Sequence, residues 1–142
     1  MHLIFLGPPG AGKGTMAQLM AQRLKAAHIG SGNLLRETIQ RKDPLGEEIQ
    51  RVMRAGGLVP DGLVNRLIFD HVERLGRDSF ILDGFPRTVE QAQGLDEALE
   101  WLKIPIDLAV DFEVSTETIV TRLSGRRVCQ RCGSNYHDQR LP

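Results

Sequence analysis

Short apolar runs alternate along the chain with longer segments whose apolar residues recur every three or four positions. The runs predict strands at 2–6, 79–82 and 108–112. The recurring spacing predicts helices at 12–25, 32–41, 43–55, 61–75, 88–101 and 115–125. Because helices separate the strands and the runs do not alternate with polar residues, the fold class is predicted as α/β, with a parallel sheet that helices cover on both faces.

Residues typical of helix termini mark several of these boundaries. Asp43 stands before Pro44, and a cap followed by a first-turn proline predicts a helix start. Asp61 and Ser115 are expected to cap two later helices by accepting hydrogen bonds from backbone N–H groups. Beyond these helices the periodicity disappears, so residues 126–142 are expected to begin a small irregular subdomain.

Composition and charge narrow the class of protein. With 142 residues, 41% of them hydrophobic and 25% charged, the chain fits one globular domain with an ordinary core. Lysine plus arginine number 18, as do aspartate plus glutamate, so no net charge attracts a nucleic acid or an anionic membrane. No apolar stretch approaches the ~20 residues of a membrane span, and no basic start or cleavage site precedes the first strand. We therefore expect a cytoplasmic protein.

Two cysteines, Cys129 and Cys132, are separated by two residues. They are too few for the disulfide framework of a small secreted protein. Their spacing indicates a metal site or redox chemistry. The redox alternative is the less favoured one, because no strand leads directly into a Cys-x-x-Cys helix.

The clearest motif lies between the first predicted strand and the first predicted helix. Residues 7–15 read GPPGAGKGT, which contains the glycine, four residues, glycine and lysine of a phosphate-binding loop. Glycines let successive backbone N–H groups point inward, the helix places its positive end there, and Lys13 reaches the outer phosphates of a triphosphate. A hydroxyl usually follows the lysine directly, whereas here Gly14 does and Thr15 comes next. The alternative is a glycine-rich turn that only packs a helix on a sheet.

A second motif follows the second predicted strand. Residues 83–87 read DGFPR and stand at the carboxyl end of that strand, where open α/β sheets bind ligands. The Asp83 carboxylate can hold magnesium-bound water, and the Arg87 guanidinium offers a planar set of donors to a phosphate. A turn with a surface salt bridge is the alternative. Gln91 has two interpretations, because Thr88 and Gln91 also fit a capping box that needs no ligand.

Taken together, these motifs resemble the adenylate kinase family in five successive segments. The segments are GPPGAGKGT at 7–15, GSGNLLR at 30–36, GGLVPD at 56–61, DGFPRTVEQ at 83–91 and RLSGRRVCQRCGSNYH at 122–137. The resemblance covers the whole chain and implies the P-loop nucleotide kinase fold, with AMP-binding and lid insertions, in a monomer. The implied divisions are core at 1–29, an AMP-binding subdomain at 30–59, core at 60–121 and a partial lid at 122–142. Family members continue well beyond this point, so we expect the chain to be incomplete at its C-terminus.

The resemblance also implies a reaction and a role for each matching residue. The reaction is the reversible transfer of the terminal phosphoryl group from Mg²⁺-bound ATP to AMP, which gives two molecules of ADP. The implied ATP-binding residues are Gly10, Ala11, Gly12, Lys13, Gly14, Thr15, Arg122, Arg126, Asn135 and Tyr136. The implied AMP-binding residues are Ser31, Arg36, Gly57, Leu58, Val59, Gly84, Phe85, Pro86, Arg87 and Gln91. The implied catalytic residues are Lys13, Asp83, Arg87, Arg122 and Arg126.

Some expectations depend on finer details of the match. Asn33 stands where the family usually has aspartate, so weaker handling of magnesium is expected. A helix that continues to residue 125 would place Arg122 and Arg126 on one face. Cys129 and Cys132 resemble the first half of the zinc knuckle in some family lids, so structural zinc is expected only together with a second pair of ligands, which this chain does not contain.

Two alternatives to an adenylate kinase stay open. A kinase for another nucleoside monophosphate would use the same scaffold, although Ser31 and Gln91 at adenine-reading positions disfavour it. A non-catalytic nucleotide- or zinc-binding fragment is the second alternative, should the molecule end at Pro142.

Overall fold

Helices separate the four strands β1 to β4 along the protein, with three helices in succession between β2 and β3. The computed structural model describes residues 1–132 and 134–138. The elements are β1 (His2–Leu6), α1 (Lys13–Leu24), β2 (Ala27–Gly30), α2 (Ser31–Gln40), α3 (Pro44–Arg54), α4 (Asp61–Leu75), β3 (Phe80–Asp83), α5 (Val89–Leu102), β4 (Leu108–Asp111), α6 (Thr116–Ser124), β5 (Arg126–Val128) and β6 (Asn135–His137).

Four parallel strands form the central sheet in the order β2-β3-β1-β4. Strand β1 pairs with β3 on one side, where Ile4 stands opposite Leu82, and with β4 on the other, where Phe5 stands opposite Val110. Because all four strands run in the same direction, their carboxyl ends lie along one edge of the sheet. The predicted α/β fold with a parallel sheet is confirmed.

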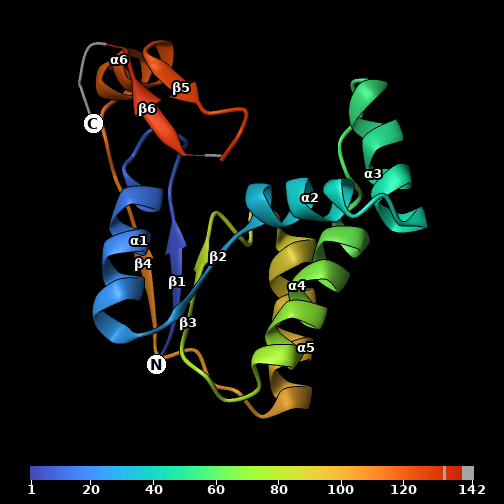
Figure 1. Ribbon diagram of the computed structural model, residues 1–142. Coiled ribbons are helices and arrows are strands. Elements are labelled where there is room, and N and C mark those ends of the chain that lie inside the picture. The colour runs from blue at the N-terminus through green and yellow to red at the C-terminus, as the bar shows by residue number, and fades with distance from the viewer. Residues whose placement is uncertain (133, 139–142) are drawn as a thin grey trace.

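Helices cover both faces of this sheet (Figure 1). Leu3 and Phe5 of β1 pack in one apolar cluster with Ala17 and Ala21 of α1. Ile4, which lies between them, belongs to the larger cluster on the other face, together with side chains of α2, α4 and α5. Successive side chains of a strand point to opposite faces, so a strand with helices on both sides needs an unbroken apolar run.

Strand β4 departs from the expectation of two covered faces. It lies at an edge of the sheet, and Leu108 keeps 57% of its surface exposed. None of the residues of α6, which follows it, is buried. The apolar run at 108–112 therefore predicts the strand correctly, but the expectation that helices cover both of its faces is wrong.

Three further predictions of local structure need correction. The pattern does not predict β2, because only Ile29 among its residues is buried and the strand is short. Strands β5 and β6 form an antiparallel pair where an irregular segment was expected. The cap at Asp61 is wrong, since Pro60 is the N-cap of α4 and no described side chain caps that helix. The caps at Asp43 and Ser115 are confirmed, because their side chains accept hydrogen bonds from the third backbone N–H beyond each.

Helices α2 and α3 pack at very short range because of a buried glycine. A Cβ atom on Gly46 would overlap the carbonyl oxygen of Thr38, which belongs to the backbone of α2. Thr38 is itself buried, and its hydroxyl donates to the Leu34 carbonyl at 2.8 Å. The backbone of α2 therefore cannot move aside without disturbing the larger apolar cluster.

Gly46→Ala is expected to lower the free energy of unfolding by about 1–3 kcal/mol, which is typical of overpacking at a buried site. Gly62→Ala is a matched control, because nothing lies within 4 Å of a Cβ atom at this position of α4. The control is expected to be neutral or to stabilise by up to about 1 kcal/mol. Urea unfolding measures both, and equal stabilities of the two variants would contradict the close packing.

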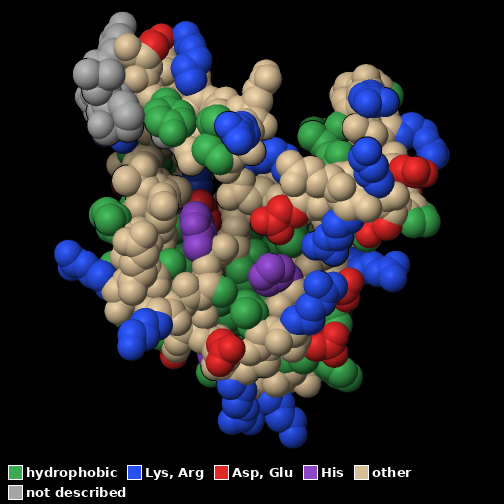
Figure 2. All heavy atoms as spheres, in the orientation of Figure 1, with side chains coloured by type: hydrophobic (Ala, Val, Ile, Leu, Met, Phe, Trp, Pro, Cys, Tyr) green, Lys and Arg blue, Asp and Glu red, His purple; other side chains and the backbone are tan. Residues whose placement is uncertain are grey.

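Two parts of the molecule project beyond the carboxyl edge of the sheet (Figure 1). One consists of α2 and α3, and the other contains α6, β5 and β6. A notch separates the two projections in the space-filling view (Figure 2). Within the described part of the chain, no helix is both long enough and apolar enough to cross a membrane.

Candidate functional site

The loop between β1 and α1 has the features of an anion-binding loop. Gly12 is the N-cap of α1 and has a φ of 94°, a left-handed conformation that glycine adopts without strain. Among the described residues, no side chain caps α1, and its first turn holds no acidic residue. The first N–H groups of the helix are therefore left for an anion.

Lys13, the first residue of α1, is the charged group of this loop. Its residue surface is 9% exposed, and its Nζ atom donates to the Pro8 carbonyl at 3.3 Å. Burial lowers the pKa of the Lys13 ammonium, the Asp83 carboxylate opposes this shift, and Arg87 and Arg126 add to it. An anion at the loop would offset the cost of burying the ammonium.

Asp83 ends β3 and lies next to the predicted phosphate-binding loop at residues 7–15, called the phosphate loop below. Its Oδ2 atom is 3.5 Å from the place that a Cβ atom on Gly14 would occupy. His28 Nε2 donates to the same oxygen at 2.9 Å. Sequence reasoning missed His28 because it belongs to the unpredicted strand β2, where it stands in register with Ile81 of β3. A prediction of β2 would have placed it close to Asp83.

Two predicted arginines lie near the loop, Arg122 on α6 and Arg126 on β5. Arg122 Nη1 donates to the Gly10 carbonyl at 3.2 Å. The predicted helical pair of arginines is wrong, because α6 ends with Gly125 as its C-cap and Arg126 is the first residue of β5. Arg126 still lies near enough for its charge to lower the pKa of Lys13.

A second group of predicted residues gathers around the Gly84 carbonyl. The Ser31 hydroxyl donates to this oxygen at 3.2 Å, and Arg87 Nε donates to it at 2.7 Å. Ser31 is buried at the start of α2, directly after β2. Because Gly84 follows Asp83 in the chain, this group adjoins the phosphate loop along the carboxyl edge of the sheet.

Gln91 links this turn to the start of α4. Its Oε1 atom accepts from the Arg87 backbone N–H at 2.7 Å, and its Nε2 atom donates to Asp61 Oδ1 at 3.0 Å. Thr88 Oγ1 accepts from the Gln91 backbone N–H at 3.1 Å, which is the first half of a capping box. The second half would be a hydrogen bond from the Thr88 backbone N–H to the Gln91 side chain, and the described contacts do not include it. The Gln91 side chain contacts Arg87 and Asp61 instead. The buried amide therefore holds the backbone of Arg87 in place.

The remaining predicted AMP-binding residues differ in their surroundings. Arg36 is exposed on α2 and donates through Nη2 to the side chain of Asn33. Phe85 is 1% exposed in the larger apolar cluster, so only its backbone can face a ligand. Pro86, after it, is partly buried.

The segment between α3 and α4 contains three predicted AMP-binding residues, of which two are exposed and one is partly buried. Leu58 is 93% exposed, and Gly57 is exposed as well. The Gly57 N–H already donates to the Val52 carbonyl at 3.0 Å, which leaves its carbonyl for other contacts. Val59 packs partly against the larger apolar cluster.

The predicted lid residues lie on the small β5–β6 sheet. Tyr136 is 42% exposed on β6. Asn135 belongs to the same strand, but its side chain lies outside the described part of the structure. Among the remaining residues predicted to bind ATP, Ala11 is buried, Gly10 and Gly12 belong to the loop, and Gly14 and Thr15 lie in the first turn of α1, where Thr15 is exposed.

Cys129 and Cys132 remain free thiols. Cys132 Sγ lies 3.3 Å from Ser134 Oγ, and hydrogen bonding with the side chain and backbone of Ser134 lowers the pKa of the Cys132 thiol. Residues 1–132 and 134–138 contain no group of three or more histidine, cysteine or acidic side chains that could hold a metal ion. The two thiols are thus at most half of a tetrahedral zinc site.

Comparison with known protein families decides the family. The family model for adenylate kinase matches residues 5–141. The chain belongs to the adenylate kinase family. Many curated adenylate kinases are similar to it over all or nearly all of its length.

Three of these adenylate kinases illustrate the similarity. The one from Thermosipho africanus is 43% identical over 143 aligned positions, which cover 100% of this chain and 67% of the relative. The one from Fervidobacterium nodosum is 47% identical, and the alignment covers 100% of this chain and 66% of the relative. The one from Desulforamulus reducens is 44% identical, with 96% of this chain and 65% of the relative covered. The chain therefore spans about two thirds of the length of these relatives.

Proposed function

We propose that the protein transfers the terminal phosphoryl group of ATP to AMP and forms two molecules of ADP. The observation that carries this proposal is the junction of two cationic sites at the consecutive residues Asp83 and Gly84. Asp83 lies beside the phosphate loop with Lys13, and the Gly84 carbonyl holds Arg87. Phosphates bound at the two sites would meet end to end, as transfer between two nucleotides requires. Membership of the adenylate kinase family supports the same reaction.

The chemistry of this transfer leaves little covalent work for the protein. An oxygen of the AMP phosphate attacks the terminal phosphorus of ATP while the bond from that phosphorus to the bridging oxygen of ADP breaks. Lys13, Arg87, Arg122 and Arg126 would align the phosphates and neutralise their charge. Two unit charges 4 Å apart interact with about 1 kcal/mol in water but about 4 kcal/mol at an effective dielectric of 20. These cations therefore act most strongly once water is expelled.

The two projections beyond the sheet are suited to expel water. In the proposal, the AMP-binding subdomain at 30–59 closes over AMP, and the lid that begins at residue 122 closes over ATP. Closure would also keep water from accepting the phosphoryl group in place of AMP. The notch between the projections is consistent with an open form of this arrangement (Figure 2).

Mg²⁺ would enter with ATP as part of the substrate. Asp83 fits this role, because a carboxylate oxygen suits magnesium and its bound water, and its Oδ1 atom has no hydrogen bond within the described residues. His28 holds Oδ2 and so fixes the orientation of the carboxylate. The Thr15 hydroxyl, exposed on the first turn of α1, is a second oxygen near the loop.

The proposed reaction can be tested by following ³¹P resonances of the 142-residue chain mixed with MgATP and a nucleoside monophosphate. Formation of ADP with AMP, and much slower reaction with CMP, UMP and GMP, is the expected result. Faster reaction with one of the other three would favour the alternative kinase. Saturable ATP binding without AMP-dependent turnover would favour a non-catalytic fragment.

Arg87→Ala is expected to weaken AMP binding by about 10–100-fold and to leave ATP affinity within about twofold. The reason is that the arginine belongs to the Gly84 group and not to the phosphate loop, and a hydrogen bond to a charged group contributes about 1.5–3 kcal/mol. Arg77→Ala, at an exposed position after α4, is the control. Titration calorimetry with each nucleotide measures the affinities, and a selective loss of ATP binding would mean that the two sites are assigned the wrong way round.

A structural zinc ion is a finer part of this proposal. Cys129 and Cys132 supply two thiols at the spacing that zinc knuckles use, and the lowered pKa of Cys132 favours the thiolate that binds metal. Two further ligands would have to come from outside these 142 residues, which hold no second pair of this kind.

We also infer that the protein acts as a cytoplasmic monomer. Free thiols are typical of a reducing compartment. One chain can supply every residue of the proposed site, so catalysis needs no second copy. Analytical ultracentrifugation in the presence of both nucleotides tests the monomer.

A further inference from the structure

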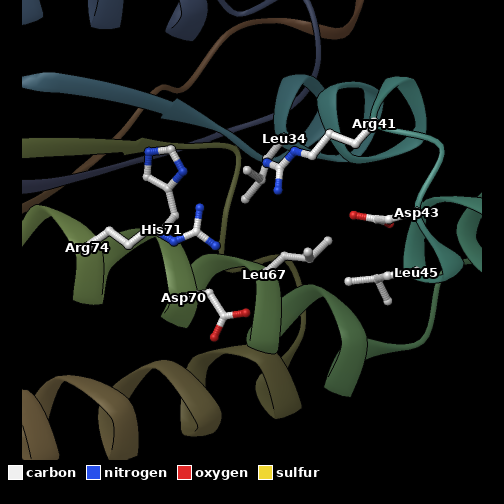
Figure 3. A pocket seen from close by; sticks show the side chains of 8 residues that line it. All are labelled: Leu34, Arg41, Asp43, Leu45, Leu67, Asp70, His71 and Arg74. Atoms are coloured by element: carbon white, nitrogen blue, oxygen red, sulfur yellow. The ribbon is translucent and has the colours of Figure 1, made fainter.

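A small pocket lies between the AMP-binding projection and the core, apart from the proposed nucleotide sites (Figure 3). It has a volume of about 170 Å³. Leu34 of α2, Leu45 of α3 and Leu67 of α4 give it an apolar part. Leu34 and Leu67 are buried, and Leu45 is partly buried. None of the residues that line the pocket belongs to the predicted ATP- or AMP-binding sets.

Two arginines that have no side-chain partner among the described residues line the pocket. Arg41 follows α2, and Arg74 stands in the last turn of α4. Both side chains are exposed, and neither makes a hydrogen bond or an ion pair within residues 1–132 and 134–138. Figure 3 shows their guanidinium groups on the side of the pocket where His71 also lies. An anionic group placed there would meet planar donors that no protein carboxylate already occupies.

Two carboxylates limit the charge that such a ligand can carry. Asp70 and Asp43 also line the pocket. Asp43 uses its Oδ1 atom to cap α3 through the Gly46 N–H at 2.8 Å, whereas Asp70 makes no hydrogen bond or ion pair within the described chain. Like charges near a bound anion are unfavourable, and the penalty grows with the charge of the ligand. The two arginines and the two carboxylates together carry no net charge, so a phosphate dianion or a polyphosphate gains no more net attraction here than a monoanion does, while more charge must be desolvated.

We propose that this pocket binds a small monocarboxylate with an apolar body, whose carboxylate pairs with Arg41 and Arg74 while its body packs on Leu34, Leu45 and Leu67. A cavity of about 150 Å³ lined by apolar side chains holds a molecule the size of benzene, so this pocket has room for one ring or a short branched chain. The site joins α2, the helix that begins at Ser31, to α4 of the core.

Benzoate is a suitable probe, because it combines one negative charge with an apolar ring of the right size. In a titration of the ¹⁵N-labelled 142-residue chain, saturable shifts are expected for the backbone amides of residues 41–43, 45 and 70–74. Benzamide, which has the same shape without the charge, is expected to bind at least about tenfold more weakly, since the hydrogen bonds to charge are lost. This comparison needs no variant of the protein.

The double variant Arg41→Gln/Arg74→Gln is expected to lower benzoate affinity about tenfold or more and to keep a dispersed spectrum, because both side chains are exposed and without partners. Arg51→Gln, an exposed arginine of α3 that does not line the pocket, is the matched control and should bind benzoate as the unchanged chain does. Absence of saturable shifts, shifts centred on residues 7–15, equal binding of benzamide, or unchanged affinity of the double variant would each overturn the proposal. Equally tight binding of inorganic phosphate would overturn it as well.

Discussion

Lys13→Met is expected to slow phosphoryl transfer by about 10²–10³-fold, the loss that follows removal of one well-placed donor to developing charge. Methionine keeps most of the buried apolar stem but loses the ammonium that donates to Pro8 and lies among the charges of Asp83, Arg87 and Arg126. Because burial disfavours the charged form of Lys13, its removal is not expected to destabilise the fold. Steady-state turnover and urea unfolding together measure the two effects.

Lys25→Met is the matched control for this experiment. Lys25 is the C-cap of the same helix, at the end remote from the phosphate loop. Its replacement should leave both turnover and ATP affinity within about twofold. Near-normal turnover of the Lys13 variant would remove the loop lysine from the mechanism.

Asp83→Asn is expected to slow turnover with MgATP by about 10²-fold, because it removes a negative charge at the place proposed for magnesium and its waters. The amide oxygen can still accept from His28 Nε2, so the local fold is expected to remain. The variant should also need a higher Mg²⁺ concentration for half-maximal rate. A rate series over Mg²⁺ concentration measures both effects.

The same variant makes a prediction about pH. The Asp83 carboxylate raises the pKa of Lys13 against the lowering effect of burial, so its removal lets that pKa fall further. The protonated lysine is then lost at lower pH, and the alkaline limb of the rate profile should move to lower pH. Asp111→Asn, at the carboxyl end of the edge strand β4, should show neither effect. An unmoved alkaline limb in the Asp83 variant would contradict the coupling between the two residues.

The sequence predicts the elements whose pattern is long or whose termini carry specific residues. The apolar run of β1 and the spacing of α1 frame the phosphate loop, and Asp43 and Ser115 cap the helices that they were expected to cap. Strand β2 escapes prediction because it is short and the sheet, not its own sequence, makes it a strand through pairing with β3. His28 is missed with it.

The sequence likewise predicts some parts of the candidate site and not others. Glycine spacing predicts the loop because a backbone that curls around an anion needs glycine at fixed positions. The hydrogen bonds of Gln91 to Arg87 and Asp61 could not be predicted, since they join segments that meet only in the folded protein. For the same reason, the sequence pattern placed Asp61 at a helix cap, whereas its carboxylate lies against Thr88 and Gln91 of the neighbouring segment.

In the proposed arrangement, two nucleotides bind on either side of Asp83 and Gly84 with their phosphates toward each other. The most direct test is an amide-resolved titration of the 142-residue chain, first with MgATP and then with AMP. ATP is expected to shift the amides of residues 10–15, and AMP is expected to shift those of Ser31, Gly84, Phe85 and Arg87. A folded chain in which neither nucleotide shifts these amides would contradict it.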